Sequence, residues 1–260
     1  MSDHTSPDTA CAMNKEKVVE AYYDDWTDRY LESFGDVFQA ARAKDDDELV
    51  AHYVKMAGIE DGMHILDAGC GVCGPSIRIA KMRDVRIDAL TISTVQVNHA
   101  RQRVRDAGLD DRITIHQGDF TNLRSIFETE KFDRIYFLES LCHGYELDKI
   151  AKGALAVLKQ QGCLYVKDFY RRPYEGLKRS WSDVVISRVE KVFCLRVRDI
   201  AEVNEAMMEE GFELAQYRKL SFDYNFEMAE RFAQTNRIDV FEGGEPIDWG
   251  DWYECLFKKP

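Results

Sequence analysis

Three glycines follow a short, mostly apolar segment and could bring backbone close to a ligand. The segment Met63–Leu66 leads into Asp67 and then into Gly69, Gly71 and Gly74. Glycine has no Cβ, so backbone N–H groups in such a turn can approach a nucleotide or an anion. The pattern predicts a cofactor-binding loop between a strand and a helix, and the alternative is a tight turn that binds nothing.

Two side chains that could take part in acid–base chemistry follow the apolar stretch that ends at Leu138. Glu139 comes directly after it, and His143 lies four residues later. A carboxylate at the end of a buried strand can accept a proton or stabilise a nearby positive charge. His143 can act as a second base or as a hydrogen-bond donor to a substrate. The structural alternatives are a carboxylate that orders the loop and a histidine that only packs.

The segments that must position these residues alternate between strand and helix patterns. Strands are expected at residues 63–67, 85–91, 112–116, 133–138, 162–168, 212–221 and 251–258. Helices are expected near residues 75–83, 94–107, 145–159, 199–210 and 225–236. This order predicts an α/β class fold, a doubly wound and mostly parallel sheet that binds its ligand at the carboxyl ends of the strands.

The N-terminal part has a different, helical pattern. Residues 1–14 are expected to form a flexible tail, and residues 15–57 a helical cap, helical over 15–34 and again over 38–57. Aromatic side chains at helical spacing mark its first half: Tyr22, Tyr23, Trp26, Tyr30 and Phe34. Residues 58–260 are expected to form the core, with a helical lid insertion at about 222–240.

Composition excludes several functions. Lysine and arginine number 35 and aspartate and glutamate 47, so the formal net charge is −12. Nucleic acids are bound by basic patches, so no nucleic-acid partner is expected. No apolar run is long enough for a membrane span, and no N-terminal signal is recognisable. The cysteine spacing fits neither a disulfide framework nor a zinc site, and Cys70 and Cys73 are expected to pack as small residues. We expect a cytoplasmic protein with a small-molecule substrate, and the sequence leaves a homo-oligomer open.

The residue at the end of the second expected strand helps to distinguish NAD from other cofactors. Dinucleotide-binding enzymes usually place an acidic residue there to bind the ribose. Here the position is Thr91, and Asp88 is expected to face away within the strand. The sequence therefore argues against NAD.

Four motifs resemble those of class I S-adenosylmethionine-dependent methyltransferases, in particular the sterol and geranyl diphosphate C-methyltransferase branch. They are Asp67-x-Gly69-x-Gly71-x-x-Gly74, Leu90–Gln96, Gln117-Gly118-Asp119-Phe120 and the Glu139-x-x-x-His143 segment, all within about residues 60–170. The resemblance implies a Rossmann-like methyltransferase fold with a seven-stranded sheet and an antiparallel last strand. It also implies S-adenosylmethionine as cofactor, with S-adenosylhomocysteine as product. The cofactor contacts implied are Asp67, Gly69, Cys70, Gly71, Thr91, Ile92, Gln96, Gly118, Asp119, Phe120 and Glu139.

The same resemblance implies C-methylation of a small apolar alkene, such as a prenyl diphosphate or terpenoid, through a carbocation. Glu139 is expected to act as base and cation stabiliser, aided by His143, Tyr22 and Tyr23. Substrate contacts are expected from Trp26, Tyr145, Phe169, Arg171, Arg172 and Trp181. The arginines would bind a diphosphate, which Mg²⁺ could accompany, although no all-protein metal site is expected. The alternatives are N- or O-methylation of a small metabolite and a non-catalytic relative.

Overall fold

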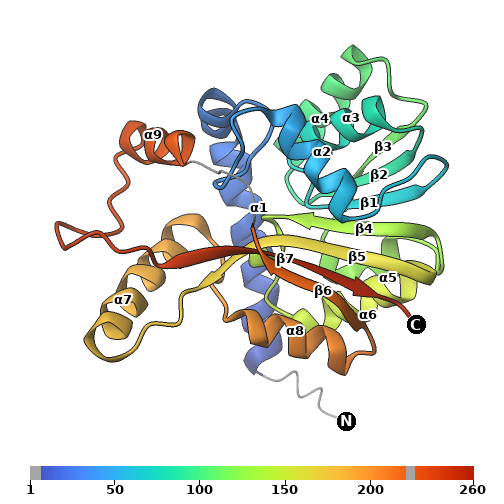
Figure 1. Cartoon of the computed structure of the whole chain (residues 1–260). Helices are drawn as coiled ribbons and strands as arrows, with labels where there is room; N and C mark the ends of the chain where they lie inside the picture. Colours follow the sequence, from blue (N-terminus) through green and yellow to red (C-terminus); the bar gives the residue numbers. More distant parts are fainter. Residues whose placement is uncertain (1–6, 221–225) are drawn as a thin grey trace, which may run out of the picture.

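The computed structural model describes residues 7–220 and 226–260, in which seven strands form one sheet (Figure 1). The strands are β1 (His64–Ala68), β2 (Arg86–Thr91), β3 (Ile113–Gln117), β4 (Phe132–Leu138), β5 (Leu158–Arg171), β6 (Glu213–Lys219) and β7 (Gly250–Lys258). Their order is β3-β2-β1-β4-β5-β7-β6. The first five are parallel, and β7 runs antiparallel to both of its neighbours. The predicted doubly wound sheet with an antiparallel last strand is confirmed.

Helices cover both faces of the sheet. The described helices are α1 (Pro7–Phe34), α2 (Asp46–Met56), α3 (Gly74–Met82), α4 (Thr94–Asp106), α5 (Leu123–Ile126), α6 (Leu147–Val157), α7 (Gly176–Phe193), α8 (Ile200–Glu209) and α9 (Glu227–Thr235). Leu49 of α2, Ile79 of α3 and Val104 of α4 belong to the core on one face. Ile150 of α6 and Met207 of α8 belong to the core on the other face. Burial of these apolar side chains on both faces stabilises the sheet.

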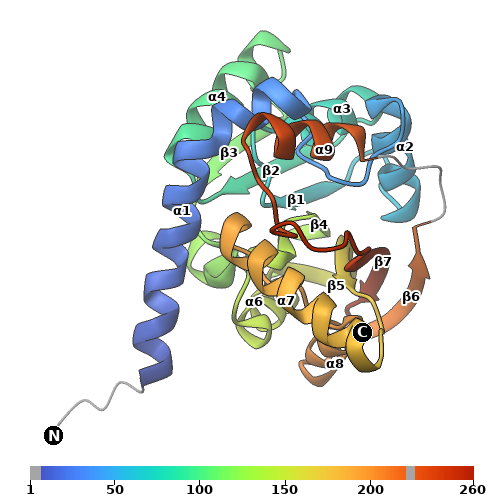
Figure 2. The same cartoon turned by 90° about the vertical axis from the view of Figure 1, so that its left-hand side faces the viewer.

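Helix α1 crosses the carboxyl ends of the parallel strands (Figures 1 and 2). Asp24 Oδ1 accepts hydrogen bonds from Ser93 Oγ at 2.6 Å and from Val95 N at 3.2 Å, at the start of α4. The helix begins at Pro7, so residues 7–14 are helical rather than part of the tail expected at 1–14, whose first six residues lie outside the described range. No helix within 7–220 and 226–260 combines the length and the apolarity that crossing a membrane requires.

The helix expected over 38–57 is wrong in its first part. Helix α1 ends before Gly35, which has a φ of +67°, and α2 begins only after Asp45, whose side chain accepts from Asp47 N and Glu48 N. The intervening residues 35–45 form an irregular segment, here called the strap. Its conformation is fixed by partners elsewhere in the chain, as described below.

A helix that the sequence pattern did not predict follows β5. Helix α7 lies beyond the extended end of β5 and packs Val185, Ile186 and Val189 against Phe169 and Trp252. The late helical insertion is present as α9, whose Phe232 stacks on Tyr30 of α1 with ring centroids 4.6 Å apart. Of the lid expected at 222–240, residues 222–225 lie outside the described range.

Candidate functional site

A pocket of about 1030 Å³, part of it open to solvent, lies at the carboxyl ends of the strands under α1 and the strap. The core contributes Asp67, Gly69, Cys70, Gly71, Val72, Pro75, Thr91, Ile92, Gln96, Gly118, Asp119, Phe120, Thr121, Leu138, Glu139, Ser140, His143, Tyr145 and Glu146. Helix α1 and the strap contribute Glu16, Val19, Tyr23, Asp36, Phe38 and Gln39. Every position predicted to bind a cofactor therefore lines one pocket.

The glycine loop between β1 and α3 is packed too tightly for side chains. A Cβ added at Gly69, where φ is +98°, would lie 2.4 Å from Ser140 Cβ. A Cβ at Gly74 would lie 1.9 Å from the carbonyl oxygen of Asp36 in the strap. Both distances are far below van der Waals contact, so glycine at these positions allows the loop, the end of β4 and the strap to meet around the pocket.

Asp67, at the end of β1, is buried beneath this loop. Its Oδ2 accepts a hydrogen bond from Ser76 Oγ at 2.6 Å, and the Tyr136 hydroxyl lies 2.7 Å from the same Ser76 oxygen. Burial raises the pKa of Asp67 to about 7, although the Ser76 and Tyr136 hydroxyls oppose this shift. The carboxyl group is thus poised to change its charge near neutral pH when a cation or donor arrives.

Two further polar side chains lie at the carboxyl ends of the neighbouring strands, Thr91 at the end of β2 and Asp119 just after β3. Thr91 Oγ1 donates to Gln96 Oε1 at 2.6 Å, which fixes the Gln96 amide at the pocket wall. Asp119 Oδ1 accepts from Thr121 N at 2.8 Å. Asp119 Oδ2 is buried and has no hydrogen-bond partner within the described residues. A buried carboxylate oxygen without a donor is costly, so a ligand donor at this point would be stabilised.

Glu139 follows β4 in the left-handed conformation, with a φ of +52°. Its Oε1 forms a buried ion pair with Lys167 Nζ and accepts from Trp252 Nε1 at 3.0 Å and from Ala41 N at 3.3 Å. Its Oε2 accepts only from Ala40 N, at 2.7 Å, among the described residues. One oxygen is therefore fully engaged, whereas the other keeps acceptor capacity.

Lys167 connects Glu139 to the strap. Its ammonium group is 0% exposed and also donates to Gln39 Oε1 and to the carbonyl of Ala41, each at 2.9 Å. Burial lowers the pKa of Lys167, and the adjacent carboxylate of Glu139 opposes that shift. The strap is in turn part of the pocket wall, since Gln39 lines it.

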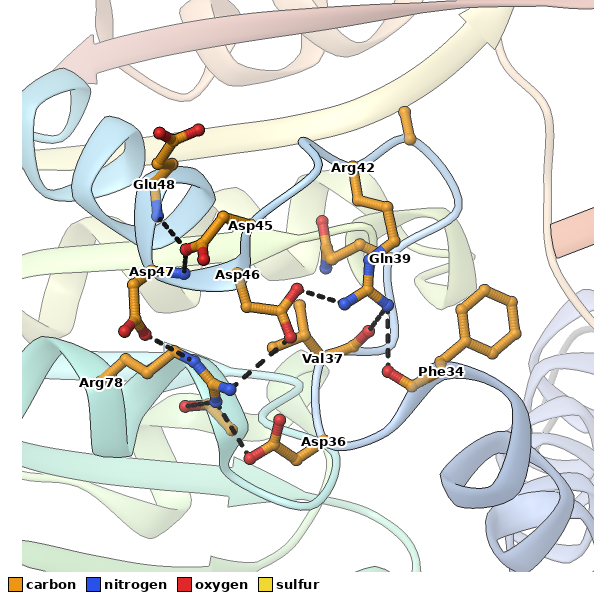
Figure 3. Close-up of polar contacts among 12 residues, drawn as sticks. Phe34, Asp36, Val37, Gln39, Arg42, Asp45, Asp46, Asp47, Glu48 and Arg78 are labelled. Atoms are coloured by element: carbon orange, nitrogen blue, oxygen red, sulfur yellow. Dashed lines mark hydrogen bonds and ion pairs between the residues drawn. The ribbon is translucent and has the colours of Figure 1, made fainter. Parts of the chain in front are cut away.

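The other end of the strap is anchored by arginines (Figure 3). Arg42 donates to the carbonyls of Phe34 and Val37 at 3.0 and 2.8 Å and pairs with Asp46. Asp36 accepts from Arg78 of α3 at 2.9 Å and from Arg103 of α4 at 2.5 Å. The Arg42 contacts are local in sequence, whereas those of Asp36 reach α3 and α4, and these non-local bonds hold the start of the strap in a non-helical conformation.

His143 and Tyr23 form a second polar pair in the pocket. His143 Nδ1 lies 3.0 Å from the carbonyl oxygen of Cys194, which can only accept, so Nδ1 carries the proton. His143 Nε2, 2.8 Å from the Tyr23 hydroxyl, is then the acceptor. Burial lowers the pKa of His143 to about 4, so the ring is neutral near pH 7. Tyr145, also predicted, lines the same pocket.

Four predicted aromatic residues lie outside the lining. Tyr22 is buried, its hydroxyl 2.7 Å from that of Tyr30, and its ring stacks on Trp26. Phe169 packs in the core formed by α7 and β7. Trp181 donates to the carbonyl of Glu245 at 2.8 Å. Helical spacing and aromatic character do not distinguish these packing roles from substrate contacts.

The two predicted arginines are also not in the pocket. Arg171 pairs with Asp183 of α7, and Arg172 pairs with Asp251 at 2.8 Å and Asp248 at 3.2 Å. Arg171 is the last residue of β5, beyond the strand end predicted at residue 168, and Arg172 follows it. No lysine or arginine of the described chain lines the pocket, whereas six acidic residues do: Glu16, Asp36, Asp67, Asp119, Glu139 and Glu146.

Several pocket residues were missed from the sequence. Glu16, Asp36, Phe38 and Gln39 come from segments without a recognisable motif. Lys167 also lies outside the motifs recognised in the sequence. One signal could have identified it, because a lysine between Val166 and Phe169 in a buried strand needs an anionic partner.

Comparison with known proteins gives a consistent picture. A family model described as a methyltransferase domain matches residues 59–210. Sterol 24-C-methyltransferase erg6 of Aspergillus fumigatus is 30% identical over 155 residues, which cover 57% of this chain and 41% of that protein. The chain spans about half the length of the curated relatives it matches.

Solved structures share the fold. The [4+2]-cyclase SpnF aligns with a TM-score of 0.78 and 22% identity, over 95% of this chain and 96% of that one. Geranyl diphosphate C-methyltransferase from Streptomyces coelicolor A3(2), in complex with Mg²⁺, geranyl diphosphate and S-adenosyl-L-homocysteine, aligns with a TM-score of 0.71 and 13% identity. That alignment covers 100% of both chains. At these identities the likeness concerns the fold.

Proposed function

The chain belongs to the S-adenosylmethionine-dependent methyltransferases, and from this membership we propose that it methylates a carbon atom of a small, uncharged apolar alkene such as a terpenoid. The observation that carries the proposal is the environment of the Glu139 carboxylate. Its carboxylate lies in a pocket with the aromatic side chains of Tyr23, Phe38 and Phe120 and is held by a buried lysine. Aromatic faces and a fixed carboxylate both stabilise a developing cation.

The cofactor supplies an electrophilic methyl group on a positively charged sulfur. Asp119 Oδ2, the buried acceptor without a partner in the described chain, accepts from the adenine amino group. The close-packed loop at Gly69 lets backbone N–H groups approach the ligand, and Asp67 balances its positive charge. These residues fit a cationic, adenine-containing ligand.

The proposed reaction at carbon needs a base after the methyl transfer. The alkene carbon forms a bond to the methyl group as the carbon–sulfur bond breaks, which leaves a cation on the substrate. Loss of a proton from the neighbouring carbon then restores a double bond. Glu139 accepts this proton at Oε2, because Oε1 is occupied by Lys167, Trp252 and Ala41.

The charge of the lining favours a neutral substrate over a prenyl diphosphate. No lysine or arginine of the described chain lines the pocket to bind a diphosphate. The cations nearest to its carboxylates are already paired, Lys167 with Glu139, Arg78 and Arg103 with Asp36, and Lys149 with Glu146. Binding a diphosphate would require Mg²⁺ brought with the substrate, whereas an uncharged terpenoid or sterol-like alkene needs only apolar contact.

Turnover with methyl-labelled S-adenosylmethionine tests the proposal. The panel comprises neutral terpenes and sterols, prenyl diphosphates with and without Mg²⁺, alcohols and amines, with products located by NMR. We expect a new carbon–methyl bond on a neutral alkene. The variant Glu139→Gln, which leaves the Lys167 ammonium without its counter-ion, should still bind S-adenosylhomocysteine but lose at least about a hundredfold in turnover. Near-normal turnover in this variant would rule out Glu139 as the base.

A second candidate is methylation of oxygen or nitrogen, which the neutral His143 ring favours. Its Nε2 accepts the Tyr23 proton, so the pair can take up a proton from a substrate hydroxyl or amine through the Tyr23 oxygen. Labelled methyl on oxygen or nitrogen, with Tyr23→Phe losing turnover and Glu139→Gln keeping it, would select this candidate.

A further inference from the structure

Helix α1 brings a carboxyl group to the end of the pocket where Asp119 lies. Glu16 lines the pocket together with Asp119, and Thr121 Oγ1 lies 3.5 Å from Glu16 Oε1 as its donor. Asp119 is held by Thr121 N through Oδ1, while Oδ2 is buried and lacks a partner among the described residues. Two carboxyl groups therefore share this end of the pocket.

The groups around Glu16 favour its protonated form. Burial, followed by the interaction with Asp119 and the charge of Glu146, raises the pKa of Glu16 to about 7, although the Thr121 hydroxyl opposes the shift. The neighbouring cations have other partners. Lys15 lies over the Tyr145 ring, 4.6 Å from its centroid, and Lys149 pairs with Glu146 at 2.6 Å. Two ionised carboxylates so close together repel, so the pair retains a proton near neutral pH.

We infer that Glu16 and Asp119 jointly bind the exocyclic amino group of adenine, each accepting one of its two N–H donors, and that cofactor binding releases to solvent the proton that Glu16 holds. This inference rests on the proposed cofactor site and adds a contact from the N-terminal helix to it. It accounts for the position of α1 across the strand ends and for the unpartnered Asp119 oxygen. It also makes cofactor affinity depend on pH.

The size of the effect follows from the protonation equilibrium. A proton that must leave before the ligand binds multiplies the apparent Kd by one plus the ratio of protonated to ionised pair. With a pKa of about 7, affinity for S-adenosylhomocysteine should rise roughly tenfold from pH 6 to pH 8. Close to one proton should be released per ligand at pH 6, and few at pH 8.

Isothermal titration calorimetry of the full chain with S-adenosylhomocysteine, in buffers of different ionisation enthalpy, measures both quantities. Relative to wild type, Glu16→Gln should release close to one proton fewer per ligand at pH 6 and lose the roughly tenfold pH effect of the pair, and should bind roughly tenfold more weakly at pH 8. Glu20→Gln, one turn further along α1 and outside the lining, is the matched control and should behave as wild type. S-inosylhomocysteine, which has a carbonyl in place of the amino group, should bind weakly to wild type without this proton release.

The possible outcomes distinguish failure of this inference from failure of the proposed function on which it rests. If S-adenosylhomocysteine fails to bind at any pH, the proposed function is overturned as well. If it binds with the same proton release to wild type and to Glu16→Gln, the proton comes from another group, such as Asp67, and the inference alone is overturned. Equal affinity of the adenine and inosine ligands at pH 8 would also overturn it.

Discussion

Replacing Lys167 by methionine removes the cation on which both Glu139 and the strap depend. Methionine has similar length and keeps the apolar part of the side chain buried. It leaves the Glu139 carboxylate in place without its counter-ion and removes the donor to Gln39 Oε1 and to the Ala41 carbonyl. The protein must then either bury an uncompensated charge or rearrange the strap.

The cost can be bounded from the structure. Removing one partner of a buried ion pair costs about 3–5 kcal/mol, and the two additional acceptors place Lys167→Met toward the upper half of that range. We expect a loss of about 4 kcal/mol out of a total unfolding free energy of roughly 5–15 kcal/mol. In the double variant Lys167→Met/Glu139→Gln the buried charge is gone, so about 2 kcal/mol should be recovered.

Urea unfolding at pH 7.5, followed by circular dichroism, measures these differences. The matched control is Lys159→Met on the same strand, because Lys159 pairs with Asp133 at 2.8 Å but its side chain is 45% exposed. An ion pair of that kind should contribute less than about 1 kcal/mol. If Lys167→Met costs no more than Lys159→Met, or if the double variant is no more stable than Lys167→Met, the buried pair does not hold the strap.

Three further predictions concern the loop, the histidine and the arginines. Gly74→Ala should weaken S-adenosylhomocysteine binding at least about tenfold in calorimetry, because its Cβ displaces the strap carbonyl of Asp36; unchanged affinity would contradict the packing. His143 is neutral when folded, so the stability associated with its neutral form is fully present above pH 6.5 and is lost as pH falls toward 4, by about 3 kcal/mol in total. Urea unfolding of His143→Gln should show a shallower loss over that range, and an identical slope would refute this. Arg171→Gln and Arg172→Gln should each leave turnover within about twofold, since both arginines lie outside the pocket, and a large rise in KM would restore the diphosphate hypothesis.

The sheet and the cofactor positions could be predicted because both are encoded locally. Strands β1 to β5 appear as apolar segments separated by helical patterns, and the glycine loop is a contiguous motif. Carboxyl ends of parallel strands meet at one edge of a sheet, so Asp67, Thr91, Asp119 and Glu139 had to converge once the strand order was right. No contact between distant segments was needed to reach this result.

The conformation of the strap and the roles of Arg171 and Arg172 could not be predicted, because both depend on contacts between segments that are distant in sequence. Residues 38–45 have helix-forming composition, yet hydrogen bonds to Glu139 and Lys167, about a hundred residues later, hold them in an irregular conformation. Likewise, Arg171 and Arg172 follow a strand end and look free in the sequence. Their acidic partners come from α7 and β7, whose positions only the tertiary structure gives.

The strap links the cofactor side of the pocket to the proposed catalytic carboxylate. At Asp36 it is held by Arg78 and Arg103, from the two helices that follow β1 and β2. Four residues later its Ala40 amide donates to Glu139 Oε2, the oxygen proposed to take the substrate proton. Four residues span at most about 14 Å, so the two anchors lie close in space as well as in sequence. The cofactor loop and the base are therefore not independent parts, because one short segment, tied at both ends by buried or half-buried charges, sets the position of each relative to the other.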